Sequence, residues 1–458
     1  MHDCESVPDR ARQPSMECDA PVHVTAMPNG PACNLDCAYC YYLDTAALYP
    51  ERSSSKMSLE TLEAFTEQYI EAHPGPEVTF TWQGGEPTLR GLEFYRRAVE
   101  FQRQYAPATT RVVNTFQTNG TRLDDDWCRF FAANDFLVGI SIDGPPALHD
   151  RYRRTPAGGP TFEAVEAGLS RLQNHGVEHN VLCVVTALNS QYPRRVYEFF
   201  AELGVDWLQF IPLVEPRDGA AGPPPGTGPT DRDGTAGPDP EPSWPAHDWV
   251  RERHTPAAAS DADSVLDRAR EAPVTDRSVD PAAYGAFMQA IFEHWVRNDV
   301  GERSVRLFEH CVQVALGGPA RSCVLSETCG TQVALEHTGD VYACDHYVEP
   351  AFHRGNIHDE HLATMVDSDT QRAFGRDKRE GLPERCRRCP VREFCHGGCP
   401  KDRHLKTPRE SGLNYLCAGY RRFFTHVQPY LELFERTIDA GKPPAFVMDA
   451  VAALDDRG

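Results

Sequence analysis

Three cysteines near the amino terminus have the spacing of ligands for a reactive iron–sulfur cluster. Cys33, Cys37 and Cys40 lie in the run CNLDCAYC, which has the pattern C-x3-C-x2-C. A cubane cluster usually takes four cysteine thiolates, so this set leaves one iron free to bind another molecule. A catalytic zinc likewise keeps an open position, whereas a structural zinc is closed. The spacing predicts a reactive [4Fe–4S] cluster, with a zinc knuckle as the alternative that three cysteines leave open.

Two groups of neighbouring residues favour the cluster. Tyr39, Tyr41 and Tyr42 place aromatic rings around the cysteines, and QGGEP at residues 83–87 follows the next predicted strand. Glycines allow a backbone to approach a ligand closely. Together with the triad, these residues resemble the radical S-adenosylmethionine (radical SAM) enzymes, in which the cofactor's amine and carboxylate complete the fourth iron. The resemblance implies that the loop at 84–87 holds the cofactor's amino group.

Alternating strand-like and helix-like segments before residue 215 indicate a parallel sheet. Strands, rich in Val, Ile, Phe or Thr, are predicted at residues 23–27, 77–82, 111–117, 137–142, 180–186 and 207–213. Amphipathic helices are predicted between them at 59–72, 92–105, 125–133, 161–175 and 193–203. Such repeats form parallel sheets with right-handed crossovers. Six units are too few for a closed eight-stranded barrel, so the predicted fold is α/β, a partial (β/α)6 barrel.

The residues that could do chemistry follow the predicted strands, where such barrels collect their functional groups. The triad follows the first strand and QGGEP the second, while QTNG at 117–120 follows the third. SIDG at 141–144 ends the fourth strand, and QFIPL at 209–213 forms the sixth. Taken singly, each motif would be a turn or a buried polar group. Their shared edge predicts one site at the carboxyl ends of the strands.

Composition limits the classes of protein to which the chain can belong. It has 458 residues and a net charge of −21, which argues against nucleic acid as a partner because phosphates demand a basic surface. No run of 18 apolar residues occurs, and the amino terminus lacks the apolar core of a secretory signal, so no membrane association is expected. Sixteen cysteines without an export signal favour metal or redox use in a reducing cytoplasm over a disulfide framework.

A segment rich in Pro, Gly and Asp separates two ordered parts of the chain. Such a composition cannot bury enough apolar surface to fold, and an amphipathic helical pattern resumes over 287–308. The sequence predicts a disordered N-terminus at 1–21, the barrel at 22–215, a flexible insert at 216–282, a linking helix region at 283–315, a cysteine-rich domain at 316–436 and a tail at 437–458.

Eight further cysteines lie in the C-terminal third. They follow the order Cys323-x5-Cys329-x14-Cys344, Cys386-x2-Cys389-x5-Cys395-x3-Cys399 and finally Cys417. Eight thiolates suffice for two four-cysteine clusters, or for two zinc sites. Beside the N-terminal triad, the layout resembles the SPASM extension of peptide-modifying radical SAM enzymes. In that family the ligands interleave, which implies one auxiliary cluster on Cys323, Cys329, Cys344 and Cys399 and another on Cys386, Cys389, Cys395 and Cys417.

Most of the chain outside the insert and the two ends resembles the anaerobic sulfatase-maturating enzymes. The matching stretches are CNLDCAYCYYLD, TFTWQGGEPTLRGLEFY, FQTNGTRLDDDWC, FLVGISIDGPPALHDRYR, LQFIPLVE, CGTQVALEHTGDVYACD and CRRCPVREFCHGGCP. These enzymes oxidise a Cys or Ser of a sulfatase to formylglycine. The resemblance implies three [4Fe–4S] clusters and S-adenosylmethionine as cofactors, a sulfatase polypeptide as substrate, and an electron donor such as flavodoxin or ferredoxin.

The resemblance also implies roles for individual residues. Asp345, directly after Cys344, would be the base that takes the proton of the target thiol or hydroxyl while an electron passes to an auxiliary cluster. Arg153 would pair with the methionine carboxylate of the cofactor through a bidentate fork. Further cofactor contacts would come from Tyr39, Gly85, Ser141, Leu213 and Val214.

Two other functions stay open at this point. A different peptide-modifying enzyme of the superfamily would form thioether or carbon–carbon crosslinks in a small precursor peptide. A non-enzymatic scaffold would use its cysteines only to bind zinc and staple the fold. Iron content separates the scaffold from the enzymes, and the product formed on a sulfatase peptide separates the two enzymes. The choice between Cys and Ser as the target is left open as well.

Overall fold

The computed structural model of the chain describes residues 21–49, 56–217, 274–320, 322–406 and 411–455. The predicted disordered N-terminus falls almost entirely outside these ranges, and so does most of the predicted insert. Within the described ranges, no helix is both long enough and apolar enough to cross a lipid bilayer.

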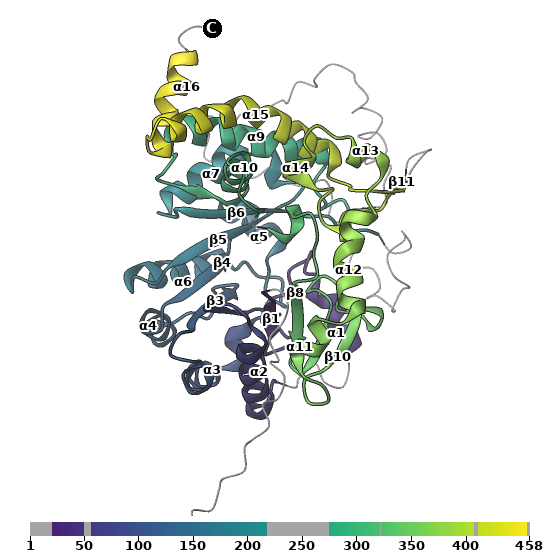
Figure 1. Ribbon diagram of the computed structural model, residues 1–458. Coiled ribbons are helices and arrows are strands. Elements are labelled where there is room, and N and C mark those ends of the chain that lie inside the picture. The colour runs from purple at the N-terminus through teal and green to yellow at the C-terminus, as the bar shows by residue number, and fades with distance from the viewer. Residues whose placement is uncertain (1–20, 50–55, 218–273, 321, 407–410, 456–458) are drawn as a thin grey trace, which may run out of the picture.

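The described residues form one large sheet with the order β10-β9-β8-β1-β2-β3-β4-β5-β6-β7, and a separate small hairpin. Six of its strands pair in parallel, each with the next along the chain. They are β1 (His23–Met27), β2 (Glu77–Trp82), β3 (Arg111–Thr118), β4 (Phe136–Ser141), β5 (His179–Val185) and β6 (Trp207–Pro212). Parallel neighbours need a crossover connection, and helices supply it on the outer face (Figure 1). The predicted α/β partial barrel is confirmed.

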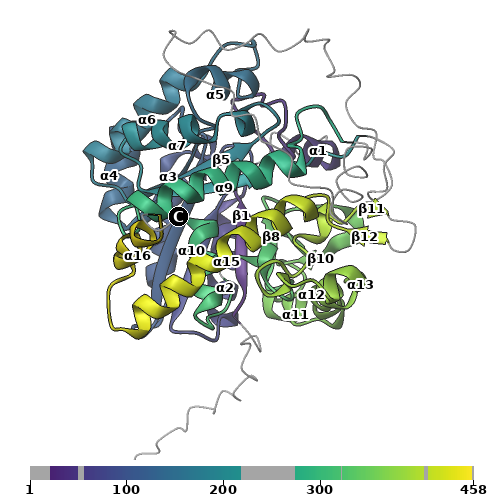
Figure 2. The ribbon, with the colours of Figure 1, turned by 90° about the horizontal axis from the view of Figure 1, so that it is seen from above.

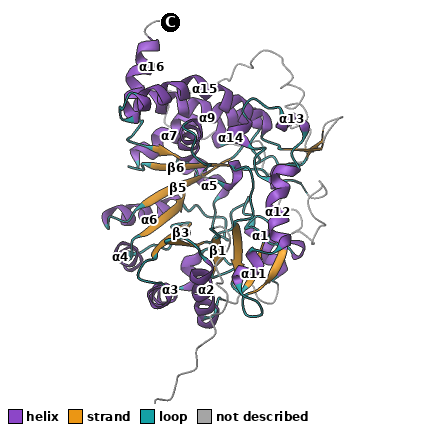
Figure 3. Cartoon of the chain, viewed as in Figure 1, coloured by secondary structure: helices purple, strands orange, loops and turns teal. Residues whose placement is uncertain are grey.

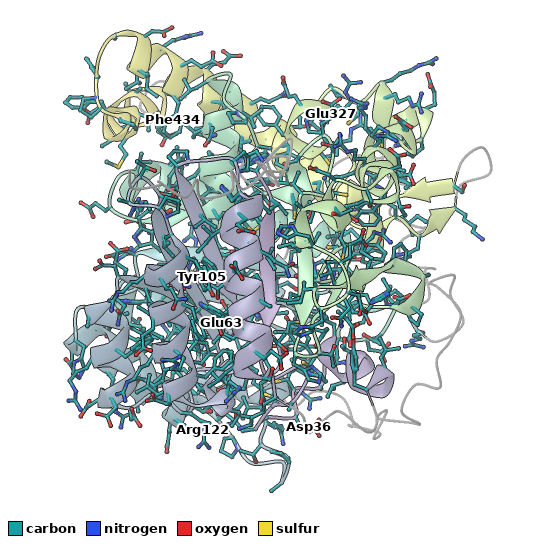
Figure 4. All side chains as sticks on the ribbon, turned by 60° about the horizontal axis from the view of Figure 1, so that its bottom comes forward. Asp36, Glu63, Tyr105, Arg122, Glu327 and Phe434 are labelled. Carbon is teal, nitrogen blue, oxygen red and sulfur yellow. The ribbon has the colours of Figure 1, made fainter. Side chains whose placement is uncertain are left out.

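The crossover helices cover the sheet (Figure 3) and pack aromatic side chains against it. They are α2 (Leu59–Ala72), α3 (Leu92–Tyr105), α4 (Asp125–Ala133), α5 (Pro146–Tyr152), α6 (Phe162–Asn174) and α7 (Pro193–Glu202). Helix α2 begins after Ser58, whose hydroxyl accepts a hydrogen bond from the backbone N–H of Thr61. Tyr105 of α3 donates to Glu63 of α2 at 3.0 Å, and Figure 4 shows these two side chains together. The core between helices and sheet includes the fully buried rings of Phe65, Tyr69, Trp82, Tyr95, Phe116 and Phe131.

The sequence predicted these strands and the helices α2, α3, α4, α6 and α7 to within one or two residues at each end. The prediction of the next helix was wrong. The pattern over 287–308 predicts one helix, whereas the structure has α9 (Pro281–Asn298), the short strand β7 (Ser304–Val305) and α10 (Arg306–Ala315). The chain turns at Asp299 and at Gly301, whose φ is +89°. Glycine adopts this conformation without steric cost. The apolar periodicity of the sequence therefore continues although the helix itself is interrupted.

The C-terminal domain extends the sheet of the barrel. Strand β8 (Gln332–Glu336) pairs in parallel with β1, with Glu336 opposite Met27, and β9 (Asp340–Tyr342) and β10 (His353–Asn356) follow in antiparallel order. The end of β9 and the residues after it contact the segment that follows β1: the hydroxyls of Tyr49 and Tyr342 are hydrogen-bonded at 2.6 Å, and the ring of His346 lies beside that of Tyr41. The remaining described elements are α1 (Tyr42–Leu48), α11 (Leu362–Val366), α12 (Asp369–Glu380), α13 (Glu384–Arg387), α14 (Arg392–Cys395), the hairpin β11 (Leu405–Lys406) with β12 (Ser411–Leu413), α15 (Cys417–Asp439) and α16 (Val447–Asp455), with six short 3-10 turns.

Helix α15 ties the C-terminal domain back to the barrel, because it runs beside α9 (Figure 2). The two helices touch at a pair of glycines. A Cβ atom on Gly419 would lie 2.1 Å from the carbonyl oxygen of Pro281, and one on Gly285 would lie 2.8 Å from the carbonyl oxygen of Gly419. This contact requires glycine at both positions. Since α15 begins at Cys417, the close packing also fixes the position of the last predicted cluster ligand.

Replacing residues 218–273 by a short Gly/Ser linker is expected to leave the fold intact. The chain ends that flank this segment already meet, because Pro216 bridges to Val274 and the N–H of Thr275 donates to the carbonyl of Glu215 at 2.9 Å. Each halving of a loop lowers its closure cost by ~0.6 kcal/mol, so an eightfold shortening should raise the free energy of unfolding by about 2 kcal/mol. Denaturant unfolding and iron content test this; a fall in either would mean that the segment packs against the barrel.

Candidate active site

The three N-terminal cysteines lie together in the loop between β1 and α1. Each thiolate affects the pKa of a neighbour, and burial raises the pKa of each of the three thiols to about 11. Iron takes thiolates, so cluster assembly must displace three protons, and iron binding weakens as the pH falls. The loop is held from the barrel: the N–H groups of Asp36 and Ala38 donate to the carbonyls of Arg154 and Tyr152. Asn119 after β3 directs its amide toward the sulfur of Cys33 at 3.7 Å.

The loops after β1 and β3 meet at the same end of the barrel. Asn34 donates to the hydroxyl of Thr121 at 2.9 Å and accepts from the amide of Asn119 at 3.0 Å. Figure 4 shows Asp36 of the first loop and Arg122, just after the second, on that side of the molecule. The sequence predicted this common edge from the positions of the motifs after the strands, and the structure confirms it.

Gly85 packs directly on the cysteine loop. Its N–H donates to the carbonyl of Gly30 at 2.8 Å, and a Cβ atom on Gly85 would lie 2.3 Å from the carbonyl oxygen of Ala32. The next residue, Glu86, is fully buried, and its carboxylate accepts hydrogen bonds from the Thr88 backbone and hydroxyl, the Thr118 hydroxyl and the Asn119 N–H. The Gly-Gly-Glu run therefore clamps the loops after β1, β2 and β3 to one another.

Arg153 forms a buried ion pair with Asp143. Its Nε donates to Asp143 Oδ2 at 2.9 Å and its Nη2 to Oδ1 at 3.2 Å, while Tyr39 donates its hydroxyl to the same carboxylate. Burial alone would lower the pKa of Arg153, but the charge of Asp143 raises it well above its usual value. The guanidinium predicted to grip the cofactor's carboxylate thus directs two of its N–H groups at a protein carboxylate. Asp143 was not predicted as a site residue, although it lies within the SIDG motif.

Breaking this buried pair is expected to destabilise the protein strongly. Asp143→Asn leaves the Arg153 charge without its partner, and such a loss typically costs about 3–5 kcal/mol. Denaturant unfolding under anaerobic conditions measures the change. Asp126→Asn is the matched control: it removes an exposed carboxylate that pairs with Arg129 on α4, and it should alter the free energy of unfolding by about 0.5 kcal/mol or less. Equal effects of the two changes would contradict the prediction.

The other predicted cofactor contacts lie along the same edge of the sheet. Ser141 at the end of β4 accepts a hydrogen bond from Gln117 of β3 at 3.0 Å. Leu213 and Val214 follow β6 and are almost fully buried. The N–H of Leu213 donates to the carbonyl of Val185 at 2.9 Å. Their assignment as cofactor contacts stays a prediction.

Asp345 faces the aromatic residues that follow the triad. Its charge raises the pKa values of Tyr41 and Tyr42, for both of which burial is the larger cause. Gln83 donates to the hydroxyl of Tyr42 at 2.8 Å and to that of Tyr41 at 3.3 Å. The ring of His346 lies 5.4 Å from the ring of Tyr41 between centroids. The C-terminal domain thus contacts the loop after β1 through His346, the residue next to Asp345.

The surroundings of Asp345 favour its ionised form. Burial alone would raise the pKa of this carboxyl, but His346, the thiol of Cys344 and the ammonium of Lys401 together lower it below its usual value. The thiol of Cys344 donates to Asp345 Oδ1 at 3.1 Å. A Cys344 that ligates iron has lost this proton, so that oxygen becomes available to accept a proton from another group.

The eight C-terminal cysteines fall into two groups. Thiolates affect one another's pKa between Cys323 and Cys329, between Cys344 and Cys399, and between Cys399 and Cys323. The other four, Cys386, Cys389, Cys395 and Cys417, line a single cavity. None of these cysteines forms a disulfide. This grouping is consistent with the two interleaved sets of four thiolates that the resemblance implies, and the assignment of each ligand stays a prediction.

Comparison with known proteins identifies the chain. Two family models match it: the radical SAM superfamily over residues 27–200 and the SPASM iron-sulfur cluster-binding domain over 323–390. A serine-type anaerobic sulfatase-maturating enzyme of Bacteroides thetaiotaomicron is 38% identical over 94% of this chain and 95% of its own length. The chain belongs to the anaerobic sulfatase-maturating enzymes. A cysteine-type enzyme of Clostridium perfringens is 29% identical to this maturase over 90% of the chain and 97% of its own length.

Solved structures show the same architecture. Native anSMEcpe with bound AdoMet and a Cp18Cys peptide superposes with a TM-score of 0.71 at 29% identity, covering 90% of the maturase and 98% of that chain. Streptococcus suis SuiB bound to the precursor peptide SuiA gives a TM-score of 0.52 at 11% identity, covering 87% and 76%, and shares the fold alone. The maturase is therefore a radical SAM enzyme that acts on a peptide substrate with three [4Fe–4S] clusters and S-adenosylmethionine. The zinc scaffold and the crosslinking enzyme are excluded.

Sequence reasoning missed several residues that surround the predicted ones. Tyr41, Tyr42 and Gln83 were recognised as neighbours of the motifs, and Asp143 as part of SIDG, but none of them received a role; Lys401 was not considered. Their common signal is position: each lies within four residues of a predicted ligand or strand end. Contact between the two domains, which brings Asp345 to Tyr42, has no signal in the linear sequence.

Proposed function

We propose that this maturase oxidises a Cys or Ser of a sulfatase polypeptide to formylglycine, with Asp345 as the base. The observation that carries the assignment of Asp345 is its hydrogen bond with the thiol of Cys344 at 3.1 Å, next to His346, whose ring lies against Tyr41 after the triad. A target side chain that reaches this junction lies next to the triad loop on one side and to Cys344 on the other.

The cofactor contributes one step. Cys33, Cys37 and Cys40 would hold the cluster at which S-adenosylmethionine binds, and the cofactor would supply the radical chemistry that takes a hydrogen atom from the target β-carbon. Asp345 takes the proton of the target hydroxyl or thiol, and one electron leaves toward the ligand set that contains Cys344. Loss of two hydrogens converts serine directly into the aldehyde. With cysteine it gives a thioaldehyde, which water converts into the aldehyde with release of hydrogen sulfide.

Three further assignments belong to this proposal. We infer that the cofactor is contacted by Tyr39, Gly85, Ser141, Arg153, Leu213 and Val214. The iron ligands are the triad and the two groups of four cysteines described above. The electron that starts the reaction comes from a small redox protein such as flavodoxin or ferredoxin. We also infer a cytoplasmic location, which is consistent with the absence of disulfides among the cysteines of the described residues.

The proposal is tested with two synthetic peptides that differ only in the target residue, Cys or Ser, within a sulfatase motif. The anaerobically purified enzyme is supplied with S-adenosylmethionine and a chemical reductant, and mass spectrometry follows the peptide and 5′-deoxyadenosine. Formylglycine in at least one peptide supports the proposal. Formation of 5′-deoxyadenosine with both peptides left unmodified would contradict it, because the radical would then form without acting on this substrate.

A further inference from the structure

Two cations lie among the auxiliary-cluster cysteines without a carboxylate partner. Lys378 of α12 is 1% exposed, and Arg403 follows the second cysteine group in a partly buried position. In the described parts of the chain, neither forms an ion pair with an acidic side chain. A buried charge is costly unless it is paired, so each of these cations needs a counter-charge of some other kind.

Lys378 is directed at the first cysteine group. Its ammonium donates to the backbone carbonyls of Cys323 and, at 3.0 Å, Val324. Burial lowers the pKa of Lys378, and the thiolates of Cys329, Cys323 and Cys399 counteract this effect. The side chain thus lies within electrostatic reach of three of the four ligands in that group.

Arg403 lies between the two groups. All of its hydrogen bonds go to carbonyl oxygens: Nε to Gly397 at 3.1 Å, Nη2 to His396 at 2.9 Å and to Gly398 at 3.2 Å, and Nη1 to Lys378 at 2.6 Å. Burial lowers the pKa of Arg403, while thiolates of both groups raise it: Cys386 and Cys395 of the second, Cys399 and Cys329 of the first.

The turn that Arg403 braces carries the chain from one group to the other. Residues 396–398 connect Cys395 of the second group to Cys399 of the first, and all three have positive φ values, of 44°, 75° and 64°. A Cβ atom on Gly397 would lie 2.9 Å from Nη2 of Arg403. The guanidinium is therefore fitted into this turn, with its charge held at one place relative to both groups.

We propose that Lys378 and Arg403 are the fixed counter-cations of the auxiliary clusters and raise their reduction potentials, Lys378 for the first cluster and Arg403 for both. The inference rests on the ligand sets of the proposed function. Neither residue touches the reacting atoms; both act through the clusters. The potential of an iron–sulfur cluster depends on net charge, hydrogen bonding and solvent exposure, and a buried cation favours the reduced, more negative state.

This role matters for the electron that leaves the substrate. Oxidation of the target releases one electron, and an auxiliary cluster that accepts it gains one negative charge. The proton goes separately, to Asp345. A cation held in a low-dielectric interior stabilises that added charge much more than an exposed cation does. Lys378 and Arg403 would thus make the transfer from substrate to cluster more favourable.

The test is a redox titration followed by electron paramagnetic resonance on the full chain. All variants are made in a chain in which Cys33, Cys37 and Cys40 are replaced by Ala, so that the signal of the N-terminal cluster is removed and only the two auxiliary clusters are observed. Lys378→Gln keeps an N–H donor for the two carbonyls but removes the charge. It is expected to lower the equilibrium constant for reduction of one cluster tenfold or more, which corresponds to a fall in reduction potential of about 59 mV for one electron. Iron content should stay unchanged. Lys378→Arg should restore most of this shift.

Arg379→Gln is the matched control, since it removes the same charge from the next residue of α12, where the side chain is 48% exposed. It should change either equilibrium less than threefold. Arg403→Gln should lower both potentials, and Arg403→Lys should lower them less. Unchanged potentials in a fully loaded Lys378→Gln protein would overturn the proposal and leave the lysine as a cap for backbone carbonyls. The titration needs no turnover, so its outcome is independent of whether formylglycine is the product.

Discussion

Asp345→Asn is expected to abolish most formylglycine formation while leaving cleavage of S-adenosylmethionine intact. Asparagine keeps the shape of the side chain but cannot accept a proton near neutral pH, and loss of a general base typically costs on the order of 10²–10⁴ in rate. The substitution acts after the radical has formed, so 5′-deoxyadenosine should still appear. Both products are measured in one anaerobic assay by mass spectrometry, together with iron content.

The iron measurement distinguishes a base from a structural support. Asp345 contacts the thiol of Cys344, a predicted ligand, at 3.1 Å, so the variant must be shown to hold about twelve irons. Asp359→Asn, an exposed change in the same domain, is the control and should leave both products unaltered. An unchanged yield of formylglycine in Asp345→Asn would remove this residue from the mechanism. A loss of iron would instead assign it to the support of Cys344.

The strands were predictable because their signals are local. Alternating strand and helix patterns fixed β1, β2 and α2–α4 to the residue or nearly so, since these elements bury continuous apolar surfaces in a fixed order. Cysteine spacing likewise predicts which cysteines bind one cluster, because a short loop must present its thiolates at fixed offsets. The helical pattern over 287–308 failed where one positive-φ turn at Gly301 interrupted an otherwise continuous apolar period.

Contacts between distant segments could not be predicted. The segment after β9 brings His346, the neighbour of Asp345, against Tyr41, and no local sequence pattern predicts this contact. The guanidinium of Arg153, just after α5, pairs with the buried carboxylate of Asp143, just after β4, although the arginine alone suggested a ligand outside the protein. Lys378 looks like one more basic residue at the end of an amphipathic helix. Only its burial, with backbone carbonyls and thiols around it, separates it from its exposed neighbour Arg379.

Replacement of Cys33, Cys37 and Cys40 by Ala is expected to eliminate cleavage of S-adenosylmethionine altogether and to lower iron from about twelve to about eight per chain. The three thiols share one loop held by hydrogen bonds to Arg154 and Tyr152, and the eight C-terminal cysteines occupy separate groups. Loss of the first cluster should therefore leave the other two assembled. Iron analysis measures the fall in iron content, and the absorbance spectrum shows whether the other two clusters are still assembled. Production of 5′-deoxyadenosine measures cofactor cleavage.

The control for this change is Cys183→Ala, which removes a fully buried thiol of β5 that belongs to no predicted ligand set. It should keep about twelve irons and full cofactor cleavage, with a modest loss of stability from the small cavity. If the triad variant still cleaves S-adenosylmethionine reductively, the reactive cluster must lie in the C-terminal domain. If its iron falls well below eight, assembly of the auxiliary clusters depends on the barrel, and the β8–β1 pairing is the contact through which that dependence would act.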